Sequence, residues 1–427
     1  MKNFLKANKF SLTILGCMLV GGIVGAFWGK GADVLTPISD IFLHLLYCVV
    51  VPMIFISLVY SISKMANLRA LGKLVVVMVI IFVLTQVIAS VYMSGVCAVF
   101  NPAKGANVQL TAPQGDLTSN NNFLSMLTVS DFPQLFSRQS LMALIVFAIL
   151  CGVAIVSVGE KGKAVVNLFA SLQEVVMKMV GIIMYMAPIG LGLFFCTLIG
   201  NEGAQLAGPL ARSIIIYLVA AAVYYVFGMT LFAFIGGGAL GVRRYWANIA
   251  TLSLMALGLS SSAACIPTSL VATKKIGVPD GVRDIAIPLG TNLHKDGACL
   301  ITILKIYFMC SIFHISITPQ IFLTAILVSV IASSVMGAIP EGGYVGEIFI
   351  MSAFHFPATA IPIMVLIGTI TDAPATAINA ASQPTMAMIV TRVMEGRDWL
   401  KHFVAKEVSS AESGNNPAPA TKTITTT

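Results

Sequence analysis

The chain has 427 residues, of which 58% are hydrophobic and only 10% are charged. This composition, with a mean hydropathy of +0.94, excludes an ordinary soluble domain and indicates a protein that lies in a membrane. A net charge of +8 would favour nucleic acid as the partner of a soluble protein, but here we expect membrane lipid around the chain and no nucleic acid.

Apolar stretches long enough to cross a bilayer, about 20 residues each, recur along the chain and predict an all-α polytopic membrane protein. The first follows three lysines and lacks a clear cleavage pattern of small residues, so we expect a retained helix instead of a secretory signal. The complete stretches cover residues 11–28, 36–60, 74–100, 139–157, 168–200, 213–240, 281–313 and 360–392.

Basic residues are concentrated in alternate connections between these stretches. Because positively charged loops stay in the cytoplasm, this pattern predicts a multi-pass protein of the cytoplasmic (inner) membrane with both termini in the cytoplasm. The basic residues are Lys64, Arg69 and Lys73; Lys161 and Lys163; Arg243 and Arg244; Lys274 and Lys275; and Arg392, Arg397 and Lys401.

The eight cysteines and the C-terminal tail give no signal for a binding site. The cysteines lie singly and without a CxxC pair, so we interpret them as small apolar residues and expect neither disulfides nor a metal cluster. The tail, residues 401–427, is rich in Ser, Thr, Pro, Ala and Asn from Ser409 onward and is predicted to be a disordered cytoplasmic end.

Two further apolar stretches are interrupted in their middle. Residues 248–273 are broken at 258–267, where three serines precede a proline, and residues 321–354 are broken at 333–343. Each half is too short to cross a bilayer, and the polar backbone of each break needs partners. Such a pair predicts two re-entrant hairpins whose tips meet near the midplane and bind ions or a substrate. The alternative is a pair of helices that are kinked for packing.

The span between the two interrupted stretches contains His294, Lys295 and Asp296 in a row. Ionisable residues at membrane depth are costly unless they serve one another or a ligand. Lys295 has Asp296, Asp372 or a substrate carboxylate as candidate partners, and histidine exchanges protons in the physiological pH range. The alternatives are an internal ion pair that fixes a helix break and a packing histidine. Lys305, further along the span, has no assigned role.

The last span carries a polar stripe of four residues in an otherwise apolar helix. Asp372, Thr376, Asn379 and Gln383 follow the offsets i, i+4, i+7 and i+11, which place them on one face. A carboxylate at mid-bilayer costs about 2.5 kcal/mol or more, so the stripe is a candidate binding site. The alternative is that these residues hold helices together.

Six segments, taken in chain order, resemble the dicarboxylate/amino acid:cation symporter family, which includes glutamate, aspartate and neutral amino acid transporters. The similarity covers residues 11 to about 395. The segments are 51–59 (VPMIFISLV), like the second span; 100–105 (FNPAKG), like the turn after the third span; 184–190 (MYMAPIG), like a fifth-span segment; 260–262 (SSS), like the first hairpin tip; 295–297 (KDG), where the family has NMDG; and 339–340 (IP), where it has VPG.

The resemblance implies a homotrimer built from inverted repeats, with eight transmembrane helices, two re-entrant helical hairpins, and a transport domain that moves like an elevator against a scaffold. The implied division is 1–73 for scaffold helices 1 and 2; 74–122 for helix 3 and an extracellular loop; 123–208 for scaffold helices 4 and 5; 209–245 for helix 6; 246–280 for the first hairpin; 281–315 for helix 7; 316–355 for the second hairpin; 356–400 for helix 8; and 401–427 for the tail.

The resemblance also implies roles for single residues. Asp372 falls on the aspartate that holds the amino group of the substrate. The other implied substrate positions are Thr376, Asn379, Ser260, Ser261 and the backbone near Val335 and Met336 in the second, gating hairpin. Asp296 matches a carboxylate of a sodium site and Thr85 a hydroxyl of that site. The remaining positions that we assign to cation coupling are Asn292, His294, Lys295, Asn379 and Gln383.

The chain departs from the family at the positions that decide substrate and ion. Relatives with acidic substrates have an arginine where this chain has Leu259 or Ala375, so we expect a neutral amino acid unless Lys295 supplies the counter-charge. The family's asparagine and methionine before Asp296 are His294 and Lys295, and its last-helix aspartate is Gln383.

We therefore expect weak or absent sodium coupling, with proton coupling through His294 or Asp296, or cation-independent exchange, in its place. An uncertain sodium site remains at Asp296, and no cofactor beyond Na⁺ or H⁺ is expected.

Two other functional classes fit the sequence less well. An intramembrane hydrolase would use a serine of residues 260–262 as nucleophile and Lys295 or His294 as base, but no GxSxG motif is present. An ion channel would also place polar residues at the midplane, yet it would not need two broken hairpins. We expect a transporter and not an enzyme.

Overall fold

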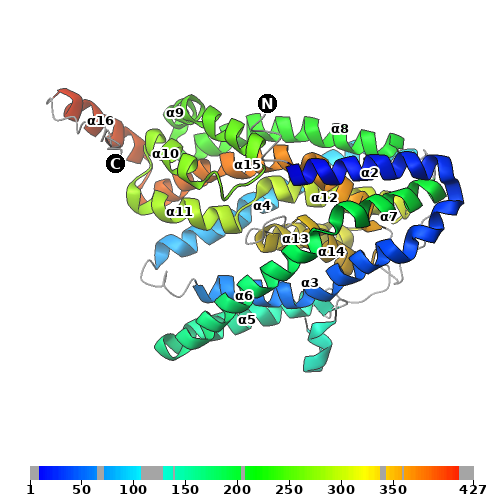
Figure 1. Ribbon diagram of the computed structural model, residues 1–427. Helices are drawn as coiled ribbons and strands as arrows, with labels where there is room; N and C mark the ends of the chain where they lie inside the picture. Colours follow the sequence, from blue (N-terminus) through cyan, green and yellow to red (C-terminus); the bar gives the residue numbers. More distant parts are fainter. Residues whose placement is uncertain are drawn as a thin grey trace, which may run out of the picture.

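A computed structural model describes residues 9–64, 72–106, 128–137, 140–202, 207–336, 343–357 and 360–412. These residues form helices and connecting turns, and none of them belongs to a β-strand. Five stretches within this part of the chain are long and apolar enough to cross a membrane, namely 12–42, 73–100, 143–183, 208–259 and 361–395. Figure 1 shows α2, α8, α12 and α15 running in similar directions, with α3 and α6 lying obliquely in the lower part of the view.

The N-terminal helices are joined by close contacts between small residues. Helix α2 packs along α7, where Gly21 and Gly25 lie directly against the backbone of Gly192 and Cys196. A side chain at either glycine would push the helices apart, as in other membrane bundles held by small residues. The elements of this group are α2 (Lys9–Trp28), η1 (Gly29–Leu35), α3 (Thr36–Lys64), η4 (Phe132–Phe136), α5 (Leu141–Val158), η6 (Gly159–Gly162), α6 (Lys163–Met184) and α7 (Ala187–Glu202).

The predicted single span over 168–200 is wrong, because the structure divides it into α6 and α7. The two helices are separated by a turn at Tyr185 and Met186. Pro188 lies in the first turn of α7, where its missing N–H costs nothing, but it cannot extend a helix that comes from its N-terminal side.

The remaining helices contain the interruptions that the sequence predicts. α9 ends at Leu259 and α10 begins at Ile266, so the first predicted break is present. The stretch 281–313, which was predicted to be complete, is instead divided at His294 and Lys295 into α11 and α12. The tip of the second hairpin, residues 337–342, lies outside the described residues. The elements are α4 (Lys73–Phe100), α8 (Ala207–Val223), η8 (Tyr224–Gly228), α9 (Met229–Leu259), α10 (Ile266–Ile276), α11 (Asp280–Leu293), α12 (Asp296–Ile312), α13 (Pro319–Met336), α14 (Gly343–Phe354) and α15 (Ile361–Glu395).

The segment α9 consists of two helical parts that meet at a kink at Gly238, whose φ is 64°. The boundary between helix 6 and the first hairpin at residue 245 stays a prediction. Positive φ is accessible to glycine without a steric cost. The carbonyl of Ile235 accepts a hydrogen bond from Arg392, and that of Gly236 accepts one from Trp399 at 2.8 Å. Side chains thus satisfy backbone groups next to the kink.

The tail was predicted to be disordered from residue 401. A further helix, α16 (Trp399–Glu412), instead extends into it. Trp399 and Leu400 are buried, Phe403 packs against the same core, and the guanidinium of Arg244 lies 5.5 Å from the Phe403 ring centroid. Three apolar residues at helical spacing therefore dock α16 on α9. Residues 413–427 of the predicted tail lie outside the described residues.

The core of the molecule lies around α12 and α15. Every residue from Asp296 to Cys310 is buried, and so is every residue from Ala375 to Thr391. A helix that is buried on all sides is usually apolar all round, so the polar side chains on these two helices are exceptions that need partners. The candidate site is built from those exceptions.

Candidate functional site

The polar stripe of α15 meets the break between α11 and α12. Gly297 lies against the backbone of Ala375, so no side chain fits there and the helices approach closely. Asn379 Oδ1 accepts hydrogen bonds from the backbone N–H of Gly297 at 2.8 Å and of Ala298 at 3.3 Å. It caps the first turn of α12, whose N–H groups have no partner within the helix. Gln383 Nε2 donates to the His294 carbonyl at 3.0 Å.

The break places the His294 ring in a fully buried polar network. His294 Nε2 lies 2.8 Å from Thr85 Oγ1 and 3.0 Å from Asp296 Oδ1. His294 and Asp296 are both 0% exposed. Tyr224, in the π-helical turn η8, donates a hydrogen bond from its hydroxyl to Asp296 Oδ2 at 3.0 Å. Two elements that are distant in sequence, α4 and η8, therefore meet the imidazole and the carboxylate at the break between α11 and α12.

The network accommodates a proton on either nitrogen of the His294 ring. Thr85 Oγ1 lies 3.0 Å from the Ile81 carbonyl and Ser382 Oγ lies 3.0 Å from the Asn379 carbonyl, so each hydroxyl has an acceptor within its own helix. Nδ1 of His294 lies 3.4 Å from Ser382 Oγ. Both ring nitrogens therefore face an oxygen that can accept a hydrogen bond, and a proton on one nitrogen or on both has a partner.

The imidazole of His294 occupies the space beside the oxygen atoms of Thr85 and Asp296. An ion in contact with both Thr85 Oγ1 and Asp296 Oδ1 would have to displace the imidazole, which already touches both atoms. Asn379 Oδ1 is used by the backbone of α12. Hard cations prefer oxygen ligands, and imidazole is not among their usual partners. Asp296 Oδ1 has no aligned hydrogen-bond donor among the described residues, so it remains an atom at which positive charge is favourable.

The other half of the stripe is open. Asp372 is exposed, whereas Thr376 is buried. Within the described residues, no hydrogen bond or ion pair reaches the side chain of Asp372, Thr376 or Lys295. Lys295 is half-buried and close enough to Asp372 for electrostatic attraction. Charged and hydroxyl groups without protein partners at this depth are free to contact a polar solute.

The structure places the remaining predicted site residues less centrally. Ser260 directly follows the last residue of α9 and has a positive φ of 46°. Ser261 Oγ accepts a weak hydrogen bond from Ala264 N at 3.4 Å. Both are half-buried. Val335 and Met336 end α13, but their side chains lie outside the described residues. Asn292 is exposed, and its side-chain amide donates a hydrogen bond to the Pro288 carbonyl of the same helix. The structure therefore does not bring Asn292 into the His294 network.

The side chain of Gln86 connects α4 to two other helices, and this role was not predicted from the sequence. Its Nε2 donates to the carbonyl of Leu293 at 2.9 Å, and its Oε1 accepts from the hydroxyl of Ser333. It therefore ties the end of α11 and the first arm of hairpin 2 to α4. A polar residue inside the apolar stretch 74–100 was the only available signal, and nothing in the sequence indicates its partners.

A second buried ion pair lies beside the stripe and was also missed. Lys305 Nζ and Glu347 Oε1 are 2.7 Å apart, with side chains only 5% and 3% exposed. Gly368 faces this pair from α15, one helical turn before Asp372, and a Cβ there would lie 2.6 Å from Nζ and 2.8 Å from Oε1. The pair attaches α14, the second arm of hairpin 2, to α12. A lysine and a glutamate within two apolar stretches were a signal for such a pair.

Comparison with known proteins agrees with this architecture. A model of the sodium:dicarboxylate symporter family matches residues 10–393. A proton/sodium-glutamate symport protein of Bacillus subtilis is 25% identical over 91% of this chain and 94% of its own length. A proton/glutamate-aspartate symporter of the same organism is 25% identical over 94% and 97%. A C4-dicarboxylate transport protein of Bacillus subtilis is 24% identical over 79% and 82%.

Proposed function

Because the chain belongs to the sodium:dicarboxylate symporter family, we propose that it is a secondary transporter that moves an amino acid or a dicarboxylate across the cytoplasmic membrane together with a proton. The relatives are named as symporters of glutamate or aspartate and as transporters of C4-dicarboxylates. The family and these relatives are transporters and not enzymes, which argues against the hydrolase alternative.

The observation that carries proton coupling is the position of the His294 ring. It touches Thr85 and Asp296, two positions that the family resemblance assigns to a sodium site. Gln383 supplies a neutral amide where relatives have a carboxylate, so the site has lost one negative charge. An imidazole can carry a proton, so in this proposal a charge held on the protein takes the place of the mobile metal ion.

We infer that the substrate is a neutral amino acid. Asp372 has no hydrogen-bond or ion-pair partner among the described residues and suits an ammonium group, with the buried Thr376 next to it. The positions at which acidic-substrate relatives have an arginine are Leu259 and Ala375. Without a guanidinium at either position, a second carboxylate on the substrate would be buried without a bidentate partner, which is costly.

A second candidate is an acidic amino acid or dicarboxylate, and the position of Lys295 favours it. This ammonium is half-buried and has no hydrogen-bond or ion-pair partner in the part of the chain that the structure describes. It is attracted by Asp372 and would also attract a substrate carboxylate. If Lys295 serves this role, Lys295→Met removes uptake of acidic substrates and spares uptake of neutral ones.

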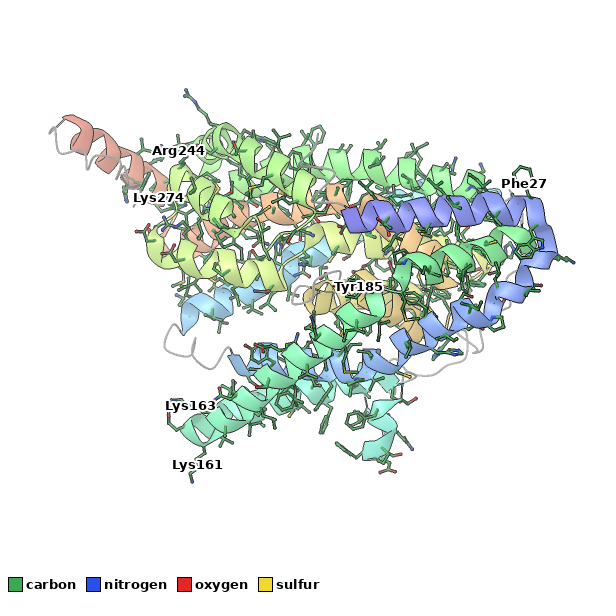
Figure 2. The ribbon with its side chains drawn as sticks, viewed as in Figure 1. Phe27, Lys161, Lys163, Tyr185, Arg244 and Lys274 are labelled. Atoms are coloured by element: carbon green, nitrogen blue, oxygen red, sulfur yellow. The ribbon has the colours of Figure 1, made fainter. Side chains whose placement is uncertain are left out.

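For the whole molecule we propose an elevator mechanism in a homotrimer. The scaffold would contain α2, α3 and α5 to α7, and the moving part would contain α4 and α8 to α15. Figure 2 shows Lys161 and Lys163 at the same end of the molecule as Arg244 and Lys274, with Phe27 at the opposite end. Basic residues from both groups of helices at one end support a cytoplasmic position for that end and for both termini.

Uptake into proteoliposomes tests this function. Purified protein is reconstituted, and accumulation of labelled neutral amino acids, glutamate, aspartate and succinate is measured under an inward pH gradient or an inward sodium gradient. We expect accumulation of a neutral amino acid that follows the pH gradient and saturates at low substrate. Non-saturating flux would favour the channel, and counterflow without a gradient response would favour the exchanger.

A further inference from the structure

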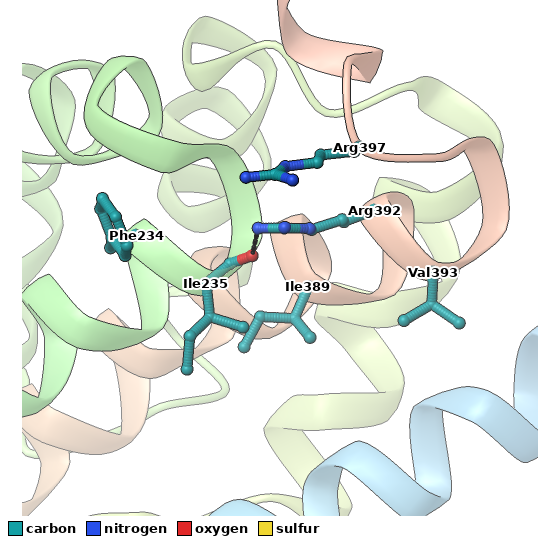
Figure 3. A pocket seen from close by; sticks show the side chains of 6 residues that line it. All are labelled: Phe234, Ile235, Ile389, Arg392, Val393 and Arg397. Atoms are coloured by element: carbon teal, nitrogen blue, oxygen red, sulfur yellow. Dashed lines mark hydrogen bonds between the residues drawn. The ribbon is translucent and has the colours of Figure 1, made fainter.

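A cavity of about 620 Å³ lies between α9 and the C-terminal end of α15, far along α15 from Asp372. Figure 3 shows the arginine side chains of Arg392 and Arg397 extending side by side toward α9, above the apolar side chains that complete the wall. The lining residues are Phe234, Ile235, Ile389, Arg392, Val393 and Arg397.

The wall of the cavity combines exposed apolar side chains with two guanidinium groups. Phe234 and Val393 expose 55% and 52% of their surface, and Ile235 exposes 41%. Next to them stand two guanidinium groups, which bind phosphate with two parallel hydrogen bonds. The apolar part suits an acyl chain and the cationic part suits an anionic headgroup.

The two arginines differ in what holds them. Arg392 donates to the Ile235 carbonyl through one nitrogen, so its guanidinium is fixed at the edge of the cavity, and its other donors have no partner among the residues that the structure describes. Arg397 is exposed and has no hydrogen bond or ion pair among the described residues. A site with one preorganised donor group loses less entropy when it binds its ligand.

The nearest acidic side chain on the same connection is already paired. Asp398 lies 2.7 Å from Lys401 Nζ, and the Lys401 ammonium lowers the pKa of the Asp398 carboxyl, with His402 and Arg397 adding to the effect. Glu395 is exposed and does not line the cavity. The positive charge of Arg392 and Arg397 is therefore not cancelled inside the cavity.

We propose that this cavity, defined by its six lining residues, binds the phosphate headgroup of an anionic phospholipid, with the acyl chain along Phe234 and Val393. The proposal rests on the proposed membrane orientation, with this end at the cytoplasmic face, and it is independent of the transported substrate and of the coupling ion. Basic pockets between membrane helices on the cytoplasmic side suit such headgroups. A phospholipid there would hold α15 against the kinked end of α9.

The test compares lipids and soluble anions on the purified full-length protein. Melting temperatures are measured in detergent after addition of phosphatidylglycerol, of phosphatidylcholine with the same acyl chains, or of inorganic phosphate. Arg397→Gln removes the unpaired guanidinium. Arg243→Gln is the matched control, because Arg243 is equally exposed, lies on α9 and does not line the cavity. Arg392 is left intact because it also satisfies the Ile235 carbonyl.

We expect phosphatidylglycerol, and not phosphatidylcholine, to raise the melting temperature of the wild type and of Arg243→Gln. In Arg397→Gln the concentration of phosphatidylglycerol needed for half of the shift should rise roughly fivefold, as expected for one basic residue near an anionic lipid. Three results would overturn the proposal: equal shifts with the two lipids, equal loss in both variants, or an equal shift with phosphate alone, which would indicate a site for a free anion.

Discussion

The imidazole of His294 bridges a hydroxyl and a carboxylate that come from different helices. His294→Gln keeps a polar side chain of similar size but cannot carry a proton. We predict that this variant still binds substrate. Accumulation driven by a pH gradient should fall at least tenfold, because the side chain that is proposed to carry the proton is lost. Uptake and substrate-induced thermal shift are measured in parallel, since ligand binding raises the melting temperature.

His402→Gln is the matched control for this variant, because His402 is exposed on α16. It should leave uptake unchanged. A wild-type pH response in His294→Gln would show that another group carries the proton.

Asp372 is the carboxylate to which we assign the substrate's amino group. Asp372→Asn keeps the shape and removes the charge, and loss of a charged hydrogen bond of about 1.5–3 kcal/mol should weaken substrate binding roughly tenfold or more. Binding is read from the substrate-induced thermal shift. Asp131→Asn, at an exposed position outside the helices of the site, should have no effect. Unchanged binding in Asp372→Asn would place the amino group elsewhere.

The sequence identified residues whose position follows from helical periodicity and missed those whose role depends on a distant partner. The stripe from Asp372 to Gln383 follows from its spacing, and the structure places it at the helix break. The partners of His294 and Asp296 do not follow from spacing, because Thr85 is 209 residues away and Tyr224 is 72 residues away. Lys305 was noticed without its partner Glu347 for the same reason.

The Lys305–Glu347 pair links α14 to α12 inside the core. Removing one partner leaves the other charge buried and alone, which costs about 3–5 kcal/mol. Lys305→Met should therefore lower the melting temperature strongly, whereas the double variant Lys305→Met with Glu347→Met should recover most of the loss. Melting of the purified proteins measures both. A double variant that is as unstable as the sum of the two single variants would contradict a mutual interaction.

Gly368 provides the space in which this pair fits. Gly368→Ala places a Cβ within 2.6 Å of Lys305 Nζ, so it should displace the pair and cost about 1–3 kcal/mol, as overpacking does. Gly95→Ala is the control, since Gly95 also lies within a helix but a Cβ added there would meet no atom within 4 Å. That variant should be neutral or slightly stabilising. Equal melting temperatures of the two variants would show that the pair has room to move.

At the level of elements, long apolar stretches were predictable and their ends and breaks were less so. The first hairpin break follows from its serines and Pro267, which cannot continue a helix in lipid. The division of α6 from α7 and the docking of α16 were missed. The position of α16 depends on the packing of Trp399, Leu400 and Phe403 against α9. So short an apolar face cannot be recognised from the sequence, because the surface that it packs against is known only from the structure.

For the whole molecule, the proposed proton coupling changes what the proposed moving part must carry. A carrier that binds sodium acquires its charge from solution on each crossing. The His294 ring is fixed between α4, α12 and α15, so under this proposal the coupling charge moves with those helices and only its proton exchanges. Proton movement should then depend on the solute as strictly as solute movement depends on the proton.

The most direct test of this account is proton entry driven by the solute. Vesicles that contain the protein and a pH-sensitive dye are prepared in sodium-free buffer, and substrate is added outside at equal pH on both sides. The account predicts acidification of the interior with the wild type and with His402→Gln, and none with His294→Gln. Uptake of substrate without acidification, together with a requirement for sodium, would contradict it.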